Sequence, residues 1–194
     1  MKISIINYDA GNVQSVQNCL NRLGEKAIVT KDTEVLSQSD KVILPGVGHA
    51  GSAISNLKES GVWDWLQTTD VPVLGICLGM QLLGEVLSES EKGSGLGIIS
   101  ADVLGFEGNI KIPHMGWNQV KSKGNKLFNG IPDGSDFYFV HSYYMKLNPY
   151  TIAETNYSIP FSAAVQKDNC LGVQFHPEKS GKVGQQLMKN FIEL

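Results

Sequence analysis

The chain has 194 residues, a formal net charge of −3 at pH 7 and a hydrophobic content of 42%. A chain of this length buries a full core without disulfide or metal staples, so we expect a single domain over residues 1–194. A nucleic-acid binder held by phosphate contacts is excluded, because the cations do not outnumber the anions and no basic face dominates.

The N-terminal segment and the cysteines favour a cytoplasmic protein. Residues 2–7 hold one basic residue and a short apolar run without a small-residue cleavage site, which is typical of a first strand and not of a signal peptide. No segment approaches the ~18 consecutive apolar residues that span a membrane. The cysteines at positions 19, 77 and 170 are widely spaced, so we expect no disulfide framework, no metal site and no cofactor.

The first half of the chain alternates between strand and helix patterns. Apolar, β-branched segments predict strands at residues 2–7, 26–30, 41–44 and 71–76. Helical spacing of apolar residues predicts helices at residues 13–23, 50–59 and 80–87, and a turn is predicted at 9–12. Short strand–helix units of this kind indicate an α/β fold, with a mostly parallel sheet covered by helices on both faces.

In the second half, strand patterns become denser and are separated by turn residues. Strands are predicted at residues 98–105, 117–120, 136–140, 152–155, 162–167 and 171–175. We interpret them as an antiparallel or mixed extension of the sheet, closed by a helix at 182–193. Residues 88–97, rich in Ser, Glu and Gly, are predicted to form a flexible loop.

The sharpest motif is Gly75-Ile76-Cys77-Leu78-Gly79, between a predicted strand and a predicted helix. This is the arrangement of a nucleophile elbow, with Cys77 as the nucleophile. The helix N-terminus favours thiolate over thiol, and the backbone N–H of Leu78 is placed to bind an oxyanion. A small buried cysteine at the end of a strand is the competing interpretation, and the motif alone leaves the two about even.

A candidate base follows the last predicted strand, in His176-Pro177-Glu178. Pro177 favours extended backbone at His176, and extended chain places residues i and i+2 on one face. Glu178 is therefore able to orient the imidazole of His176, which completes a Cys–His–Glu triad. By itself a His-x-Glu pattern is weak evidence for a catalytic site. It becomes strong here because ligands bind at the carboxyl ends of parallel strands, where Cys77 is also expected.

Two further segments fit the same site. Pro45-Gly46-Val47-Gly48 follows the third predicted strand, where glycines let a backbone N–H approach a substrate oxygen; an ordinary turn is the competing interpretation. His141-Ser142-Tyr143-Tyr144 ends a strand with polar groups suited to a small zwitterionic ligand; a strand end with satisfied hydroxyls is equally consistent. His114 lacks metal-ligand spacing and suggests no function.

The segments around Cys77 (75–83) and His176 (172–181) resemble the class I (triad) glutamine amidotransferases. Within that family, the chain is similar to the glutaminase subunits of imidazole glycerol phosphate synthases. The segments that carry this narrower likeness are residues 7–12, 45–48, 113–118 and 138–144, together with Met80, where most relatives have His.

The resemblance implies a three-layer, flavodoxin-like fold and a thioester mechanism. Cys77 attacks the glutamine carboxamide, His176 protonates the departing ammonia, and Glu178 orients His176. The resemblance also implies that the backbone N–H of Leu78 and, after a backbone adjustment, that of Val47 stabilise the oxyanion. The residues that would hold glutamine are Gly46, Gly48, Gln81, His141, Ser142 and Tyr143.

The resemblance also implies a heterodimer in which ammonia passes to a (β/α)₈-barrel cyclase subunit. There it would react with a phosphoribulosyl-formimino carboxamide nucleotide (PRFAR) in histidine biosynthesis. By family position, the docking face or ammonia gate would include Asn12, Met115, Trp117 and Tyr138, unless these residues pack in the core. The sequence leaves open a paralogue that serves another synthase, such as a sugar-amidating enzyme, a thiol hydrolase that acts alone, and a degenerate binding subunit.

Overall fold

The computed structural model describes residues 1–8, 12–90 and 94–194. The predicted turn at 9–12 and the centre of the predicted loop at 88–97 fall mostly outside these residues. No helix in the described part of the chain is long and apolar enough to cross a membrane.

One large sheet organises the described residues, with nine strands in the order β2-β1-β3-β4-β12-β11-β10-β7-β8. The first five strands are parallel: β2 (Ala27–Thr30), β1 (Ile3–Ile6), β3 (Lys41–Leu44), β4 (Val73–Ile76) and β12 (Cys170–Val173). The other four are antiparallel: β11 (Ile159–Lys167), β10 (Thr151–Tyr157), β7 (His114–Ser122) and β8 (Ser135–His141). The prediction of a parallel sheet with an antiparallel extension is confirmed.

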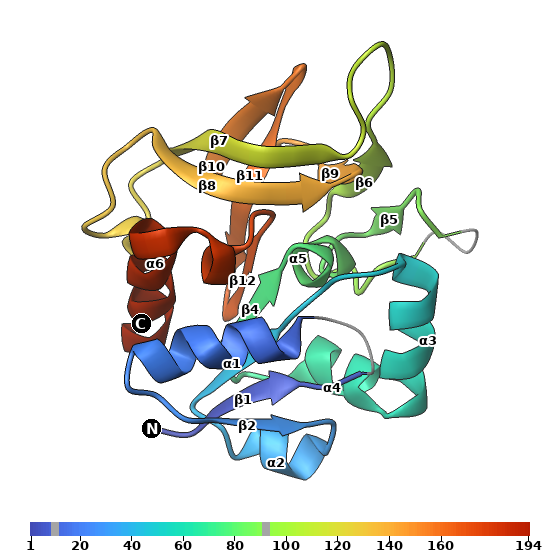
Figure 1. Cartoon of the computed structure of the whole chain (residues 1–194). Coiled ribbons are helices and arrows are strands. Elements are labelled where there is room, and N and C mark those ends of the chain that lie inside the picture. The colour runs from blue at the N-terminus through green and yellow to red at the C-terminus, as the bar shows by residue number, and fades with distance from the viewer. Residues whose placement is uncertain (9–11, 91–93) are drawn as a thin grey trace.

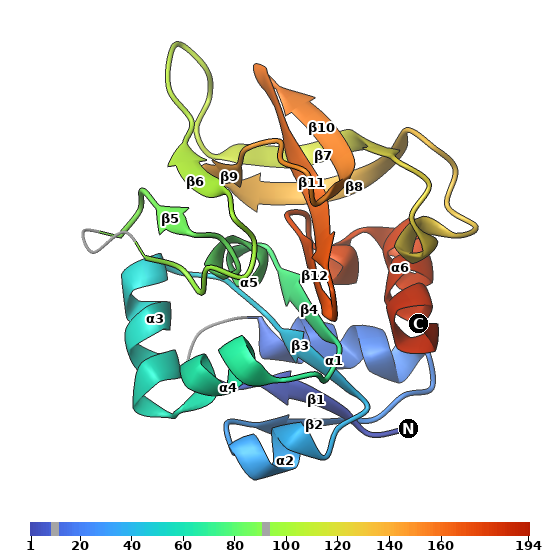
Figure 2. The same cartoon turned by 180° about the vertical axis from the view of Figure 1, so that it is seen from behind.

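Helices cover both faces of the parallel strands, as predicted (Figures 1 and 2). One face carries α1 (Val13–Arg22) and α6 (Gly181–Glu193); the other carries α2 (Thr33–Ser37), α3 (Ala50–Glu59), α4 (Val62–Thr68) and α5 (Leu78–Leu82). Neighbouring strand residues supply the two cores, because side chains alternate across a sheet. Ile5 belongs to the core that contains Leu20 of α1, whereas Ile6 belongs to the core that contains Leu57 of α3.

The predicted helix at 80–87 is wrong beyond residue 82. Helix α5 ends at Leu82, and Gly84 then lies so close to Ala101 that an added Cβ would be 3.1 Å from its carbonyl oxygen. The chain continues as β5 (Val86–Leu87), which pairs with β6 (Asp102–Gly105) and, through β6, with β9 (Tyr143–Met145) in a small second sheet. A short buried apolar run does not distinguish a helix from a strand, which explains the error.

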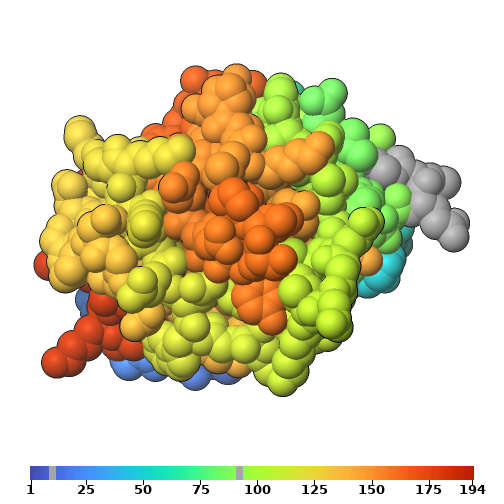
Figure 3. Space-filling view, turned by 90° about the horizontal axis from the view of Figure 1, so that it is seen from above, coloured from blue at the N-terminus to red at the C-terminus, as the bar shows by residue number. Residues whose placement is uncertain are grey.

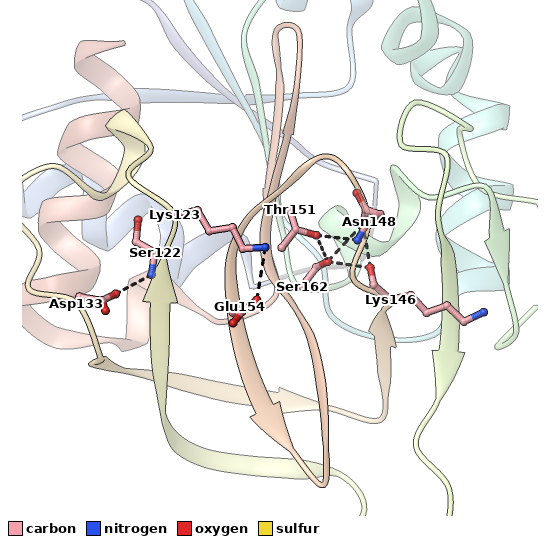
Figure 4. Close-up of polar contacts among 8 residues, drawn as sticks. All are labelled: Ser122, Lys123, Asp133, Lys146, Asn148, Thr151, Glu154 and Ser162. Carbon is pink, nitrogen blue, oxygen red and sulfur yellow. Dashed lines mark hydrogen bonds and ion pairs between the residues drawn. The ribbon is translucent and has the colours of Figure 1, made fainter.

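A buried polar cluster fixes the turn between β9 and β10 (Figure 4). The hydroxyl of Ser162 on β11 donates to the carbonyl oxygen of Lys146 at 2.8 Å and lies 2.7 Å from the hydroxyl of Thr151. Asn148 donates to the same carbonyl at 2.9 Å and to Ser162 at 3.3 Å. Because the buried hydroxyls of Thr151 and Ser162 are satisfied in this way, the chain is held at the end of β9, which contains part of the predicted ligand segment at 141–144.

Candidate active site

Cys77 occupies a sharp turn between β4 and α5, as the motif predicts. Its φ of 53° and ψ of −108° lie in a region that non-glycine residues rarely adopt. The flanking glycines are required by close packing: a Cβ on Gly75 would lie 2.6 Å from the backbone of Gly79, and a Cβ on Gly79 would collide with the carbonyl oxygen of Leu44. The strained turn therefore presents Cys77 at the carboxyl end of the parallel strands.

The sheet register brings His176 to the same edge. Val173, the last residue of β12, pairs with Ile76 of β4, and the N–H of Cys77 donates to the carbonyl oxygen of Val173 at 2.8 Å. His176 lies three residues beyond Val173, and its buried Nε2 has no hydrogen-bond partner among the described residues. Two neighbouring parallel strands thus deliver the nucleophile and the candidate base side by side.

His176 and Glu178 form a buried pair. Nδ1 of His176 lies 2.8 Å from Oε1 of Glu178, and each side chain is only 1% exposed. The predicted extended backbone occurs at His176, but Glu178 lies in the short 3-10 helix η2 (Pro177–Lys179) and not in extended chain. This turn places the carboxylate beside the ring and fixes the ring orientation.

The surroundings of His176 favour its protonated form. Burial on its own lowers the pKa of His176, but its interactions with Cys77 and Glu178 outweigh burial and raise the pKa to about 10. At neutral pH the imidazole of His176 is therefore protonated. It can donate this proton to a group that leaves from the Cys77 site.

An open pocket of about 310 Å³ lies over the sulfur. Its lining includes most of the predicted oxyanion and substrate residues, from the 45–48 segment, the elbow and the 141–144 segment: Val47, Gly48, Cys77, Leu78, Gln81, His141, Ser142 and Tyr143. Three more residues line it that the sequence did not indicate, namely Glu89, Pro113 and Val140. The structure therefore gathers segments from both halves of the chain around Cys77.

Gly46 is a predicted substrate residue that does not line this pocket. A Cβ on Gly46 would lie 2.6 Å from Cβ of Leu78, so this glycine serves the close approach of the 45–48 segment to the elbow. The hydroxyl of Tyr8 donates to the carbonyl oxygen of Pro45 at 2.6 Å and holds the start of the same segment.

The imidazole of His141 is engaged away from the ligand. Its Nδ1 donates to the carbonyl oxygen of Tyr143 at 2.7 Å, so its Nε2 is left to accept from Nδ1 of His114 at 2.9 Å. Burial lowers the pKa of His141 to about 3 and that of His114 to about 4, so both rings are neutral. His141 therefore reaches the pocket through its backbone, and its pairing with His114 was not apparent from the sequence.

Three of the four predicted docking residues lie together on β7 and β8. Met115 and Trp117 are each 58% exposed, so core packing is wrong for Trp117. Tyr138 stands opposite Trp117 in the strand register, and the two rings meet edge to face at 5.9 Å. Asn12 stands elsewhere, at the start of α1.

Glu89 is the main pocket residue that the sequence reasoning missed. Its Oε2 accepts from the N–H of Ala50 at 2.9 Å, which holds the carboxylate in place at the pocket. It lies in a Ser- and Glu-rich run with no pattern of its own, so only the fold reveals its position. Within residues 1–8, 12–90 and 94–194, no group of three or more His, Cys, Asp and Glu side chains is placed to hold a metal ion.

Comparisons with known proteins identify the family that this fold and this site represent. The model of the family "Glutamine amidotransferase class-I" matches residues 4–194. The chain belongs to this family.

Relatives of this amidotransferase chain include imidazole glycerol phosphate synthase subunit HisH from Bacteroides fragilis and from Escherichia coli. Each is 49% identical, with 100% of both chains covered. Among solved structures, a glutamine amidotransferase matches with a TM-score of 0.78 at 19% identity, covering 98% of this chain and 97% of the other. PurLQS from Thermotoga maritima matches with a TM-score of 0.71 at 16% identity, covering 99% and 97%. These two structural likenesses bear on the fold alone.

Proposed function

We propose that this chain is the glutaminase subunit of an imidazole glycerol phosphate synthase, hydrolysing glutamine and passing the ammonia to a cyclase subunit. The observation that carries the proposal is the position of Cys77 in the lining of an open pocket, with the buried His176–Glu178 pair beside it. The 49% identity to HisH chains over their full length supports this choice of acceptor.

The proposed chemistry begins with attack of the Cys77 sulfur on the carboxamide carbon of glutamine. The N–H of Leu78, at the first position of α5, has no partner within the helix and is suited to the oxyanion, with Val47 as a second donor. His176 gives its proton to the departing ammonia, which leaves a glutamyl thioester. Water then attacks the thioester, His176 takes up the proton of the water, and glutamate is released.

The pocket residues suit the free amino acid end of glutamine. Glu89 offers a carboxylate for the α-ammonium group, and the 141–143 segment offers backbone groups. Both hydrogens of Nε2 of Gln81 are used within the protein, by the carbonyl oxygen of Tyr143 at 2.9 Å and by Oε1 of Gln174 at 3.0 Å. Gln81 is therefore left with its own Oε1 for the substrate.

The proposed partner is a (β/α)₈-barrel cyclase that docks on the antiparallel strands and receives ammonia for PRFAR, yielding imidazole glycerol phosphate and AICAR. Met115 and Trp117 expose apolar surface there, which is typical of an interface. Figure 3 looks onto this end of the molecule, where the yellow-green and orange segments of the second half form the surface.

The test is glutamate release from glutamine by the chain alone, and with a cyclase subunit and its nucleotide. We expect weak hydrolysis alone and strong activation in the complex, because the partner completes the site. Cys77→Ser should abolish hydrolysis in both states while thermal unfolding is unchanged. Cys170→Ser, a buried thiol outside the pocket lining, is the matched control. Activity that survives in Cys77→Ser, or that ignores the cyclase, would contradict the proposal.

A further inference from the structure

Gln174 is a fully buried carboxamide next to the nucleophile. It follows β12, its side chain is 0% exposed, and its neighbours Val173 and Phe175 are both buried apolar residues. Its backbone N–H donates to the carbonyl oxygen of Ala163 at 2.8 Å, which anchors it to β11. Burial of a carboxamide is costly unless its polar atoms are bonded, so its partners explain its presence.

Both ends of this carboxamide are bonded to the site. Nε2 of Gln174 lies 3.6 Å from the sulfur of Cys77, and Oε1 accepts from Nε2 of Gln81 at 3.0 Å. Gln81 also donates to the carbonyl oxygen of Tyr143 at 2.9 Å. An unbroken chain of hydrogen bonds therefore runs from the pocket wall at Tyr143 to the sulfur.

The direction of this chain is set by its first member. The carbonyl oxygen of Tyr143 only accepts, so Gln81 must present its NH₂ group on this side. The same NH₂ group then requires the oxygen of Gln174, which turns the NH₂ group of Gln174 toward the sulfur. The amide orientation of Gln174 thus follows from the network.

The sulfur accepts a hydrogen bond from Gln174, but toward β8 it acts as the donor. The thiol of Cys77 donates toward the carbonyl oxygen of Val140 at 3.7 Å. That carbonyl favours the thiol, because it needs the proton, whereas the N–H of Gln174 favours the thiolate. The nucleophile therefore contacts one group that holds its proton and another that stabilises its charge.

We propose that Gln174 is a positioning residue that stabilises the Cys77 thiolate through Nε2 and holds Gln81 against the pocket through Oε1. Its role in glutamine hydrolysis rests on the proposed function, but its effect on the sulfur does not. Gln174 couples the nucleophile to the substrate-binding wall, so that a shift of the 141–143 segment changes the donor available to the sulfur.

The experiment measures the rate of Cys77 alkylation by iodoacetamide as a function of pH, with adducts located by mass spectrometry and Cys77→Ala as the blank. The other thiols are poor competitors, because burial raises the pKa of Cys19 and raises that of Cys170 to about 11. Gln174→Glu keeps an acceptor for Gln81 but offers no amide N–H to the sulfur, and Gln174→Met removes both bonds.

We expect both variants to lower the alkylation rate at pH 7 about tenfold and to move the midpoint of the profile about one unit upward, as loss of a hydrogen bond to a charged group implies. Gln166→Met is the matched control, because its carboxamide bonds Asn125 and not the sulfur; its profile should equal that of the wild type. An unchanged profile in folded Gln174→Glu and Gln174→Met would overturn the proposal.

A second variant keeps the proposal testable if the Gln174 variants fail to fold. Gln81→Met frees Oε1 of Gln174 without touching the sulfur, and should move the alkylation midpoint in the same direction by a smaller amount. No movement in Gln81→Met would contradict the coupling. Because alkylation needs neither glutamine nor a partner, a shifted profile with no glutaminase activity in the complex would reject the proposed function alone.

Discussion

The two halves of the large sheet differ in how they bury their strands. In the parallel half, β1, β3, β4 and β12 are buried at every position, because helices cover both faces. In the antiparallel half, β7 mixes buried and exposed residues and leaves Met115 and Trp117 in the open. The parallel half is thus suited to fixing the positions of side chains, and the antiparallel half to binding another protein.

The candidate site lies where the two halves meet. Cys77 and His176 come from the parallel half, yet the thiol contacts the carbonyl oxygen of Val140 on β8. The N–H of His176 donates to the carbonyl oxygen of Tyr138, also on β8, at 2.8 Å. A partner bound to the antiparallel half would therefore touch strands that contact the triad directly.

The largest effect is expected in the parallel half, from Gly79→Ala. The added methyl group would collide with the carbonyl oxygen of Leu44, and neither backbone can move aside by a rotamer change. We expect the free energy of unfolding to fall by about 3 kcal/mol or more.

Gly51→Ala is the matched control for this prediction. It lies in the first turn of α3, and its Cβ would meet only the His49 ring at 3.2 Å. It should change the free energy of unfolding by less than about 1 kcal/mol. Urea unfolding checks both variants, and equal stabilities would contradict the close packing at the elbow.

In the antiparallel half, Trp117→Ala should affect binding to the partner and leave stability nearly unchanged. Because Trp117 is 58% exposed, its loss should change the free energy of unfolding by less than about 1 kcal/mol. As an interface anchor it should weaken binding to the cyclase subunit by about 2 kcal/mol, roughly thirtyfold.

Ile28→Ala offers the control at the far edge of the sheet. Ile28 on β2 is 51% exposed, so it matches Trp117 in exposure but lies on the parallel half. Titration calorimetry should show that Ile28→Ala binds the cyclase subunit as tightly as the wild type. If both variants lost the same binding free energy, the interface would not be centred on Trp117.

Acid should weaken the protein through the His114–His141 pair. Burial lowers both pKa values, to about 4 and about 3, so the native rings stay neutral while the unfolded chain takes up protons below about pH 6.5. Stability is therefore full above this pH and falls as the pH drops toward 4, by at most about 1.4 kcal/mol per unit for each ring. The pKa of His176 is raised instead, so its contribution is lost only at higher pH and adds nothing to the acid effect.

His114→Gln isolates one ring of the pair. Between about pH 6.5 and pH 4.5 the free energy of unfolding should fall less steeply with decreasing pH in this variant than in the wild type. The two slopes should differ by up to about 1.4 kcal/mol per pH unit. Denaturant unfolding at several pH values measures both slopes. Parallel slopes would show that His114 does not resist protonation in the native state.

Sequence patterns predicted features set by neighbouring residues better than contacts between distant segments. The elbow at Cys77 and the His176–Glu178 pair have local signatures, since strain, tight glycines and i, i+2 spacing are set by nearby residues. The pairing of His141 with His114 and the arrival of Glu89 at the pocket depend on distant contacts without local signals. The strand at Val86–Leu87 was missed because its partner is supplied by a later segment, which overrides local preference.

Ser180 gives the smallest expected effect and the most direct test of how the halves are joined. Its hydroxyl donates to the carbonyl oxygen of His176 at 2.6 Å and accepts from the N–H of Tyr138 at 3.0 Å, so one side chain links the triad turn to β8. Ser180→Ala should lower the free energy of unfolding by about 1 kcal/mol. It should also slow glutamine hydrolysis in the complex about fivefold, because His176 loses part of its support. Ser55→Ala, an exposed hydroxyl bonded within α3, should change neither quantity. If Ser180→Ala lost stability but kept full activity, the link would serve folding only, and the two halves would communicate through Cys77 and Val140 instead.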